Sequence, residues 1–266
     1  MHQPTTSPLS STAISQYLSL EIREQLNIVV LDQTSSTNDI VWQHINDGHL
    51  TPMACFAETQ TAGRGRRGDQ WQSPATGNLY FSLYWPFVAD LAQSGLSIAI
   101  GISLINVLKS EGIKDLQLKW PNDVLVNRQK LAGILVESRF GKTQNTVVGV
   151  GLNFKLPTET QKLINQPATS IQQLCSELPC RNELAGKIIQ NMIETIQLFK
   201  HHGLRDFLPL WPQYDAFNNQ SIQLIGPDEQ FFARACGINE QGELRYQRGD
   251  SIETLSNSHI SIRFAS

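Results

Sequence analysis

The sequence predicts an α+β fold in which a mixed β-sheet, with its helices on one face, is followed by a small β-barrel. Between residues 28 and 219, segments that alternate every two residues like strands are interleaved with segments of helical periodicity. After residue 220 the helical pattern ends, and five short strand-like runs are separated by turn residues. We therefore expect two domains, one over residues 1–219 and a β-barrel over residues 220–266.

The composition narrows the class of protein. The chain has 266 residues, of which 40% are hydrophobic and 17% charged, enough to bury a substantial core. Its formal net charge of −3 argues against a general role on nucleic acid or on membrane surfaces. The four cysteines form no Cys-x-x-Cys pair and have no histidine at metal-binding spacing, which favours reduced thiols. Residues 1–12 have neither a basic start nor an apolar run, so we expect a cytoplasmic protein without signal peptide or membrane anchor.

The first elements follow from local pattern. We expect a helix over residues 12–25 and a strand over residues 28–31. Ser36 with Asp39 three residues later resembles a capping box, so a helix begins there, and Gly48 ends it. A short buried strand, a strand with one face in the core and a buried helix follow at residues 54–57, 78–87 and 91–109, respectively.

The next elements are strands, and helices return before the barrel. Residues 116–120 alternate like a strand, and residues 123–126 and 130–137 form a hairpin around a turn at residues 127–129. A further strand covers residues 146–153, a long helix covers residues 181–201, and Trp211-Pro212 ends a shorter helix. The barrel strands are expected at residues 221–225, 231–238, 243–246, 251–255 and 260–264.

One loop concentrates glycine and arginine. Within six positions the chain places Gly63, Arg64, Gly65, Arg66, Arg67 and Gly68. Glycine lets the backbone approach a ligand closely, and arginine supplies planar, permanently charged donors for carboxylate and phosphate. A flexible surface turn with scattered arginines is the alternative. Trp71 after the loop and three short polar side chains before it favour a loop that orders around an anionic ligand.

Segment 119–123 (Lys-Trp-Pro-Asn-Asp) is a second cluster. Pro121 keeps Trp120 extended, and Asn122 with Asp123 favours a tight turn. The segment is either a bend with a solvated Lys119 and Asp123, or a rigid platform that presents both toward an anion and its counter-cation. The spacing leaves both interpretations open.

Isolated residues carry similar alternatives. Lys130 opens an otherwise apolar strand, where its amine either reaches water or points into a cleft. Gly133 within that strand indicates a bulge or a ligand close to the backbone. Asn153 is either a strand-end cap or a pocket donor, and residues 36–38 (Ser-Thr-Asn) are either a helix cap or part of a site.

Together these segments resemble a known family. Residues 36–38, 60–68, 119–123 and 130–137, with a Gly-x-Gly-x-Asn stretch over residues 149–153, have the order and spacing of the biotin protein ligases. The sequence resembles the bacterial biotin–[acetyl-CoA-carboxylase] ligases from about residue 9 to its end. The resemblance implies a catalytic domain related to lipoate ligases, followed by an SH3-like barrel.

The resemblance also implies a reaction. In this family, the carboxylate of biotin attacks the α-phosphate of ATP with Mg²⁺, which gives biotinyl-5′-AMP and pyrophosphate. A lysine of a biotin carboxyl carrier protein then attacks the mixed anhydride, and AMP leaves. ATP and biotin are therefore the expected substrates and Mg²⁺ the expected metal. The expected assembly is a monomer or a homodimer linked to ligand binding.

Roles carry over by position. The implied biotin contacts are Ser36, Thr37, Asn38, Gln60, Arg64, Gly65, Arg66, Lys130 and Gly133. Among them, Lys130 and Arg66 are the implied catalytic residues. The implied adenylate side consists of Gly63, Gly68, Trp71, Lys119, Asn122, Asp123 and Asn153. Asp123 is the implied magnesium ligand.

Two departures from the family and two rival functions remain. Only about two dozen residues precede the first strand, too few for a winged helix-turn-helix, so we expect a ligase that neither binds nucleic acid nor represses transcription. Residues 165–169 offer no aromatic side chain to pack against adenine. A lipoate or octanoate transferase would be expected to lack the arginine loop and the barrel. A nucleic-acid-binding regulator is disfavoured because no aromatic residues interleave with the arginines.

Overall fold

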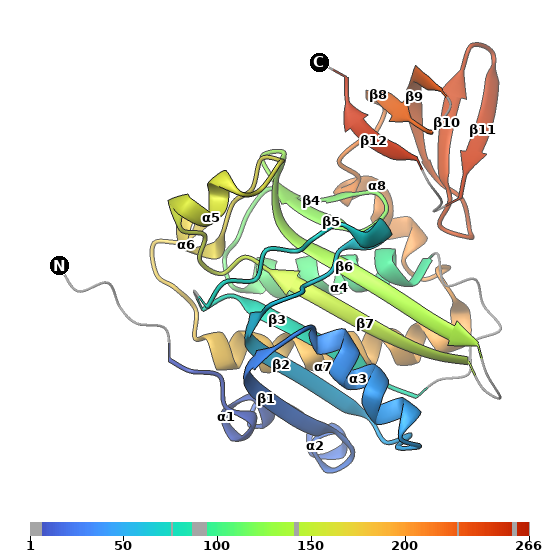
Figure 1. The fold of residues 1–266 in the computed structure, drawn as a ribbon. Helices are drawn as coiled ribbons and strands as arrows, with labels where there is room; N and C mark the ends of the chain where they lie inside the picture. The colour runs from blue at the N-terminus through green and yellow to red at the C-terminus, as the bar shows by residue number, and fades with distance from the viewer. Residues whose placement is uncertain are drawn as a thin grey trace.

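A seven-stranded sheet forms the larger part of the molecule, and a five-stranded antiparallel sheet forms its C-terminal part (Figure 1). The computed structural model describes residues 7–75, 77–86, 95–140, 144–227, 229–256 and 260–265. The order of the large sheet is β1-β2-β3-β7-β6-β5-β4, with only β1 and β2 parallel among its pairings. The predicted α+β class with a mixed sheet is confirmed.

The strands of the large sheet agree with most of the predicted ranges. They are β1 (Asn27–Thr34), β2 (Met53–Gln60), β3 (Leu79–Tyr84), β4 (Leu116–Lys119), β5 (Asp123–Val126), β6 (Gln129–Phe140) and β7 (Gln144–Leu152). The predicted hairpin is the β5–β6 pair. Its turn residues Asn127 and Arg128 have positive φ angles of 50° and 63°, the conformation of two-residue hairpin loops.

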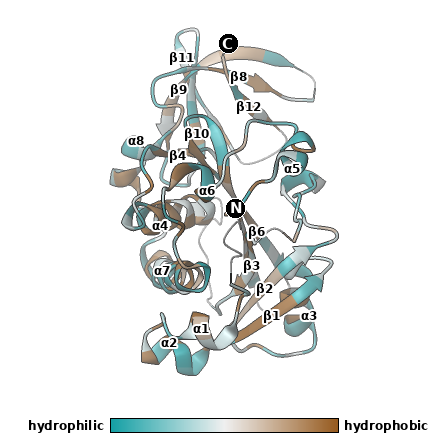
Figure 2. Cartoon of the chain, turned by 90° about the vertical axis from the view of Figure 1, so that its left-hand side faces the viewer, coloured by the Kyte–Doolittle hydropathy of each residue, from teal (hydrophilic) through white to brown (hydrophobic). Residues whose placement is uncertain are grey.

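Helices cover both faces of this sheet, so the prediction of helices on one face is wrong. The long helices α4 (Leu96–Ser110) and α7 (Arg181–His202) lie on one side, and α3 (Thr37–Asn46) lies on the other (Figure 2). Val41 and Trp42 of α3 pack in a second apolar cluster with Cys55 of β2 and Tyr84 of β3. All six residues of β3 are consequently buried, although the alternating pattern predicted one buried face.

Other helix boundaries also differ from prediction. The expected helix over residues 12–25 is two helices, α1 (Ser11–Ser15) and α2 (Leu20–Gln25), because Ser19 caps a new start by accepting the Ile22 N–H. Helix α8 (Trp211–Tyr214) begins at Trp211 rather than ending there. Proline is favoured in the first turn of a helix, where its missing N–H has no partner to lose. The expected start of α4 at residue 91 lies outside the described residues.

Short helices connect the remaining elements. They are η1 (Arg66–Gly68), α5 (Thr158–Lys162), α6 (Ile171–Leu174) and η3 (Leu208–Leu210).

The four cysteines are free thiols. Cys55 is buried, and burial raises the pKa of its thiol to about 12. Within the described ranges, none of the helices combines the length and apolar character needed to cross a bilayer.

The C-terminal sheet contains the five predicted strands and packs against the large sheet. Its strands are β8 (Ser221–Ile225), β9 (Gln230–Ile238), β10 (Leu244–Arg248), β11 (Ser251–Leu255) and β12 (Ser261–Phe264). The Trp120 indole N–H donates to the Gly242 carbonyl over 2.9 Å, and the rings of Phe217 and Phe264 lie 4.8 Å apart. These contacts join the turn between β9 and β10 to the segment after β4, and β12 to the segment after α8; residues of β12 also line the cavity described next.

Candidate active site

Most of the residues implied by the sequence line one cavity. The cavity has a volume of about 230 Å³ and is bounded by the basic loop (residues 63–68), the large sheet and β12. Its lining includes Ser36, Thr37, Asn38, Gln60, Arg64, Gly65, Arg66, Trp71, Lys119, Asn122, Asp123, Lys130 and Gly133. A second cavity of about 870 Å³ shares Trp71, Lys119 and Lys130 with the first and adds Asn153. Gly63 and Gly68 line neither cavity.

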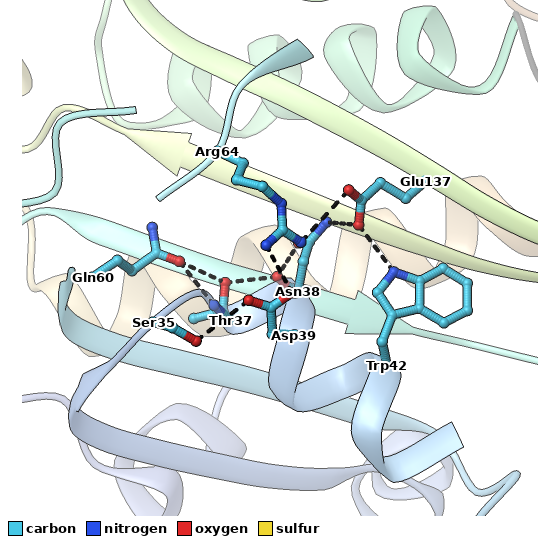
Figure 3. A network of polar contacts seen from close by, with 9 residues as sticks. Ser35, Thr37, Asn38, Asp39, Trp42, Gln60, Arg64 and Glu137 are labelled. Atoms are coloured by element: carbon cyan, nitrogen blue, oxygen red, sulfur yellow. Dashed lines mark hydrogen bonds and ion pairs between the residues drawn. The ribbon is translucent and has the colours of Figure 1, made fainter. Parts of the chain in front are cut away.

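Thr37, Asn38 and Gln60 of the first cavity's lining belong to a network of polar contacts (Figure 3). Its members are Thr37, Asn38, Trp42, Gln60, Ser82 and Glu137. The Thr37 backbone N–H donates to Gln60 Oε1 over 2.8 Å, and the Thr37 and Ser82 hydroxyl oxygens lie 2.6 Å apart. Ser82 Oγ donates to Asn38 Oδ1, and Asn38 Nδ2 donates to Glu137 Oε2 over 2.8 Å. These linked bonds fix each side chain in one orientation.

The first residues of α3 contribute side chains to this network and do not form a capping box. Ser36 occupies the N-cap position, but its side chain makes no capping hydrogen bond. Asp39 Oδ1 instead lies 2.7 Å from Arg64 Nη1, so the predicted capping box is wrong. A tertiary ion pair has replaced the local bond that the sequence pattern favoured. Ser36 is buried and lines the cavity.

Gly149 leaves the room that Asn38 occupies. A Cβ on Gly149 would lie 2.4 Å from Asn38 Oδ1, closer than non-bonded atoms approach. We expect Gly149→Ala to displace Asn38 and so to lower the affinity for a ligand that contacts the polar network. The free energy of unfolding should fall by about 1–3 kcal/mol. Titration of the ligand by calorimetry, beside a thermal melt, measures both effects. Gly48→Ala is unsuitable as a control because of its positive φ, whereas Gly226→Ala meets no atom closer than 3.4 Å. Unchanged affinity in Gly149→Ala would show that Asn38 has space to move.

The basic loop is folded by its own backbone. Trp71 N donates to the Gly63 carbonyl over 2.9 Å, and Gly65 N donates to the Asp69 carbonyl over 2.6 Å. Arg67 has a positive φ of 60° at the tip of the loop. The loop is therefore a short hairpin whose tip extends over the cavity.

The three arginines of the loop contact three different parts of the molecule. Arg64 reaches Asp39 of α3 and also Glu137 of β6, at 3.6 Å. Arg66 Nη1 donates to Asn122 Oδ1 over 3.4 Å, and Arg67 Nη2 donates to the Ile260 carbonyl. The loop thereby spans the large sheet, the segment after β4 and the C-terminal sheet.

Trp71 lies flat against two glycine-bearing strands. A Cβ on Gly151 would lie 2.3 Å from Trp71 Cε2, and a Cβ on Gly133 would lie 2.9 Å from Trp71 Cζ3. Lys130 Nζ lies 5.1 Å from the centre of the indole ring. Gly133 thus makes room for an indole. The indole nitrogen of Trp71 is buried and has no hydrogen-bond partner among the described residues.

Cationic side chains form another part of the cavity lining, with Lys119 on β4, Lys130 on β6 and Arg66 on the basic loop. Lys130 Nζ lies 2.8 Å from Asp123 Oδ1, so the Lys130 amine points into the cavity rather than to water. Burial lowers the pKa of Lys119, and the charges of Lys130 and Arg263 lower it further, against the opposing effect of Asp123. Burial likewise lowers the pKa of Arg66. Several partly desolvated cations around one space are suited to bind a phosphate or carboxylate.

The segment after β4 is a held platform rather than a solvated bend. The Trp120–Pro121 peptide bond is cis, and Ser97 Oγ donates to the Pro121 carbonyl over 2.9 Å. Asn122 Nδ2 donates to the Ile134 carbonyl over 2.8 Å. The neighbouring Asp123 side chain is mostly buried, with 14% of it exposed.

Asn153 acts on the backbone. Its Nδ2 donates to the carbonyls of Lys130 and Thr169, over 3.2 Å and 3.1 Å. Asn153 therefore fixes the chain at the start of β6, from which the Lys130 side chain leaves, and it lines the second cavity from there.

The site fits a magnesium ion carried by a phosphate ligand. No group of three or more histidine, cysteine, aspartate or glutamate side chains in the described part of the chain is placed to hold a metal. Mg²⁺ in nucleotide sites is held by one or two carboxylates together with phosphate oxygens and water. Asp123, a largely buried carboxylate beside Lys119 and Lys130, suits that arrangement.

The sequence analysis missed several residues of the site. Asp39 and Ser82 entered it only as a cap and a strand residue, and Glu137, Ile260 and Arg263 had no role. Glu137 carried a signal, a charged side chain within an apolar strand, where an ionised group needs a partner. The lining residues of β12 carried none, because only the packing of the C-terminal sheet brings them to the cavity.

Comparison with known proteins agrees with this geometry. The Biotin/lipoate A/B protein ligase family matches residues 30–153. The bifunctional ligase/repressor BirA of Salmonella typhimurium is 37% identical over 242 residues, which cover 90% of this chain and 75% of that protein. The biotin–[acetyl-CoA-carboxylase] ligase of Mycobacterium tuberculosis is 34% identical over 174 residues, covering 63% of this chain and 62% of that protein.

A solved structure has the same fold. The biotin protein ligase from Aquifex aeolicus in complex with biotin and ATP superposes with a TM-score of 0.74, at 24% identity, over 90% of this chain and 99% of that one. The sequence matches and the fold agree, and the chain belongs to the biotin protein ligases of the biotin/lipoate A/B protein ligase family.

Proposed function

We propose that this cavity activates biotin with ATP and passes it to a lysine of a biotin carboxyl carrier protein. The chain is an ATP-dependent biotin ligase, as its family and relatives are. One observation carries the assignment of the site. The same cavity is lined by the uncharged side chains of Thr37, Asn38 and Gln60 and by the cations Lys119, Lys130 and Arg66.

The polar network suits the ring system of biotin. Thr37, Asn38 and Gln60 offer uncharged donors and acceptors, which match the cyclic urea of biotin better than a charged group would. Trp71 supplies an apolar wall beside them. The valerate chain then directs its carboxylate toward Lys130 and Arg66.

In the first step, a biotin carboxylate oxygen attacks the α-phosphorus of ATP, and pyrophosphate leaves. Negative charge develops on the phosphoryl oxygens, where Lys130, Lys119 and Arg66 would stabilise it. Mg²⁺, when bound, neutralises part of the phosphate charge. Asp123 is the carboxylate that would hold it, and it also orients Lys130 over 2.8 Å.

In the second step, the neutral amine of a carrier lysine attacks the carbonyl carbon of the mixed anhydride, an amide bond forms and AMP leaves. Until the carrier binds, water must be kept from the same carbonyl. The basic loop, which spans the cavity through Arg64, Arg66 and Arg67, is placed for that task.

We further propose the biotin carboxyl carrier protein of acetyl-CoA carboxylase as the partner, in the cytoplasm. The net charge of −3 argues against nucleic acid as a second partner. The enzyme would act as a monomer or as a homodimer that forms with ligand.

Mass spectrometry of the carrier tests the function. The purified chain, biotin, ATP and Mg²⁺ should add one biotin to one lysine of the carrier, and a carrier with arginine at that lysine should stay unmodified. Octanoate and lipoate in place of biotin test the rival acyl transferase. Transfer of either acid with equal efficiency, or no transfer of biotin, would reject the assignment.

The lowered pKa of Lys119 predicts a pH dependence. Only the protonated amine stabilises phosphate charge, and that form is lost as pH rises through the lowered pKa. We therefore expect the KM for ATP to rise on the alkaline side, below the pH at which an ordinary lysine titrates. Lys119→Arg should remove this rise, because arginine stays protonated. A profile that is identical in the variant and the unmodified chain would assign the alkaline limb to another group.

A further inference from the structure

The guanidinium of Arg64 lies between two carboxylates from different elements (Figure 3). Arg64 Nη1 is 2.7 Å from Asp39 Oδ1 on α3, and Arg64 Nη2 is 3.6 Å from Glu137 Oε1 on β6. The three side chains are partly exposed, at 33%, 40% and 28%. Ser35 Oγ donates to the second oxygen of Asp39 over 3.3 Å, which limits its rotation.

This pairing separates Arg64 from the other loop arginines. Its guanidinium contacts carboxylates of α3 and β6, whereas Arg66 contacts Asn122 after β4 and Arg67 contacts the Ile260 carbonyl beside β12. Glu137 also accepts hydrogen bonds from Asn38 and Trp42, so Arg64 joins the loop directly to the polar network. A side chain so engaged is better suited to hold the loop than to bind the carboxylate of a substrate.

We propose that Asp39 is a positioning residue, which holds the basic loop over the biotin-binding part of the cavity through Arg64. The kinetic consequences rest on the proposed function, whereas the structural consequence does not. Asp39 touches neither the reacting atoms nor the cations Lys119 and Lys130. Its loss should therefore weaken retention of biotin and of the adenylate more than it weakens binding of ATP, to which Lys119 and Lys130 contribute independently of the loop.

Asp39 lies in the first turn of α3, where a carboxylate also stabilises the helix. A role confined to the helix would leave the loop unaffected. The loop itself offers a direct readout, because Arg64, Arg66 and Arg67 are sites of tryptic cleavage. A loop that leaves the cavity is cleaved faster.

Limited trypsin digestion without ligands is the first test. We expect Asp39→Asn to raise the rate of cleavage within residues 63–68 by about twofold to fivefold, as for the loss of one partly exposed ion pair. Asp39→Glu, which keeps the charge, should restore slow cleavage. Asp47→Asn, an exposed carboxylate at the other end of the same helix, is the matched control and should cleave like the unmodified chain.

A mutant cycle separates the ion pair from helix stability. Cleavage after Arg66 and Arg67 should be at least as fast in Arg64→Gln, which also loses Glu137, as in Asp39→Asn, and the double variant should be no faster than Arg64→Gln. Additive increases, or slow cleavage in Asp39→Asn at an unchanged melting temperature, would overturn the proposal.

Kinetics then connects the contact to the reaction. We expect Asp39→Asn to raise the KM for biotin and the release rate of biotinyl-5′-AMP by a similar factor, and to raise the KM for ATP less, because Lys119 and Lys130 do not belong to the loop. A fall in kcat alone would contradict a positioning role. An unmodified chain that makes no adenylate would instead reject the proposed function, while the digestion result would stand by itself.

Discussion

Replacing Lys130 with alanine is expected to slow formation of biotinyl-5′-AMP by about a hundredfold to a thousandfold, the usual effect of removing one donor that stabilises developing charge. Lys130 is the cation whose amine lies 2.8 Å from Asp123 Oδ1 and 5.1 Å from the centre of the Trp71 ring. The substitution removes a positive charge from the site where negative charge develops on the phosphoryl oxygens. Water in its place would stabilise that negative charge less well.

Release of pyrophosphate in a single turnover measures this effect. Lys130→Ala also leaves the mostly buried Asp123 without its ion pair, so a thermal melt must accompany the kinetics. Lys130→Arg keeps the charge and should retain more activity than Lys130→Ala. Lys162→Ala, an exposed lysine paired with Glu159, is the control. Pyrophosphate release at the normal rate in a folded Lys130→Ala protein would remove Lys130 from the reaction.

Replacing Arg66 with alanine is expected to speed the escape of biotinyl-5′-AMP by roughly tenfold to a hundredfold, the equivalent of one or two hydrogen bonds to a charged group. Arg66 joins the loop to Asn122 at 3.4 Å, and its guanidinium is partly desolvated, which lowers its pKa. A donor in this setting binds an anion more strongly than one in water.

The escape rate follows from a chase with unlabelled adenylate after a single turnover. Arg245→Ala, an exposed arginine on β10, controls for the loss of net charge. An adenylate off-rate that is unchanged in Arg66→Ala would show that the loop closes over the cavity without contacting its contents.

Local chemistry predicted much of this fold. The hairpin turn at Asn127 and Arg128 and the five short C-terminal strands follow from residues that are close in sequence. The side of the sheet on which α3 packs does not follow from residues that are close in sequence. Ser82 and Tyr84 look solvent-facing in an alternating strand, and only the tertiary position of α3 buries them.

The candidate site shows the same division. The glycine–arginine loop that supplies Arg66 was noticeable from its composition, whereas Thr37 and Lys130 were assigned to the site only through the family resemblance. The partner of each side chain could not be predicted from composition or spacing. Asp39 had a local bond available to it as a cap, and the ion pair with Arg64, 25 positions away, replaced that bond in the folded chain.

The central claim is that one cavity holds an acyl-adenylate under the basic loop until a carrier arrives. The most direct measurement is mass spectrometry of the chain after incubation with biotin, ATP and Mg²⁺ and removal of free ligand by gel filtration. The claim predicts about one biotinyl-5′-AMP retained per chain, together with protection of residues 63–68 from trypsin. Adenylate found only in the free fraction, or a loop cleaved as fast with adenylate as without it, would contradict the claim.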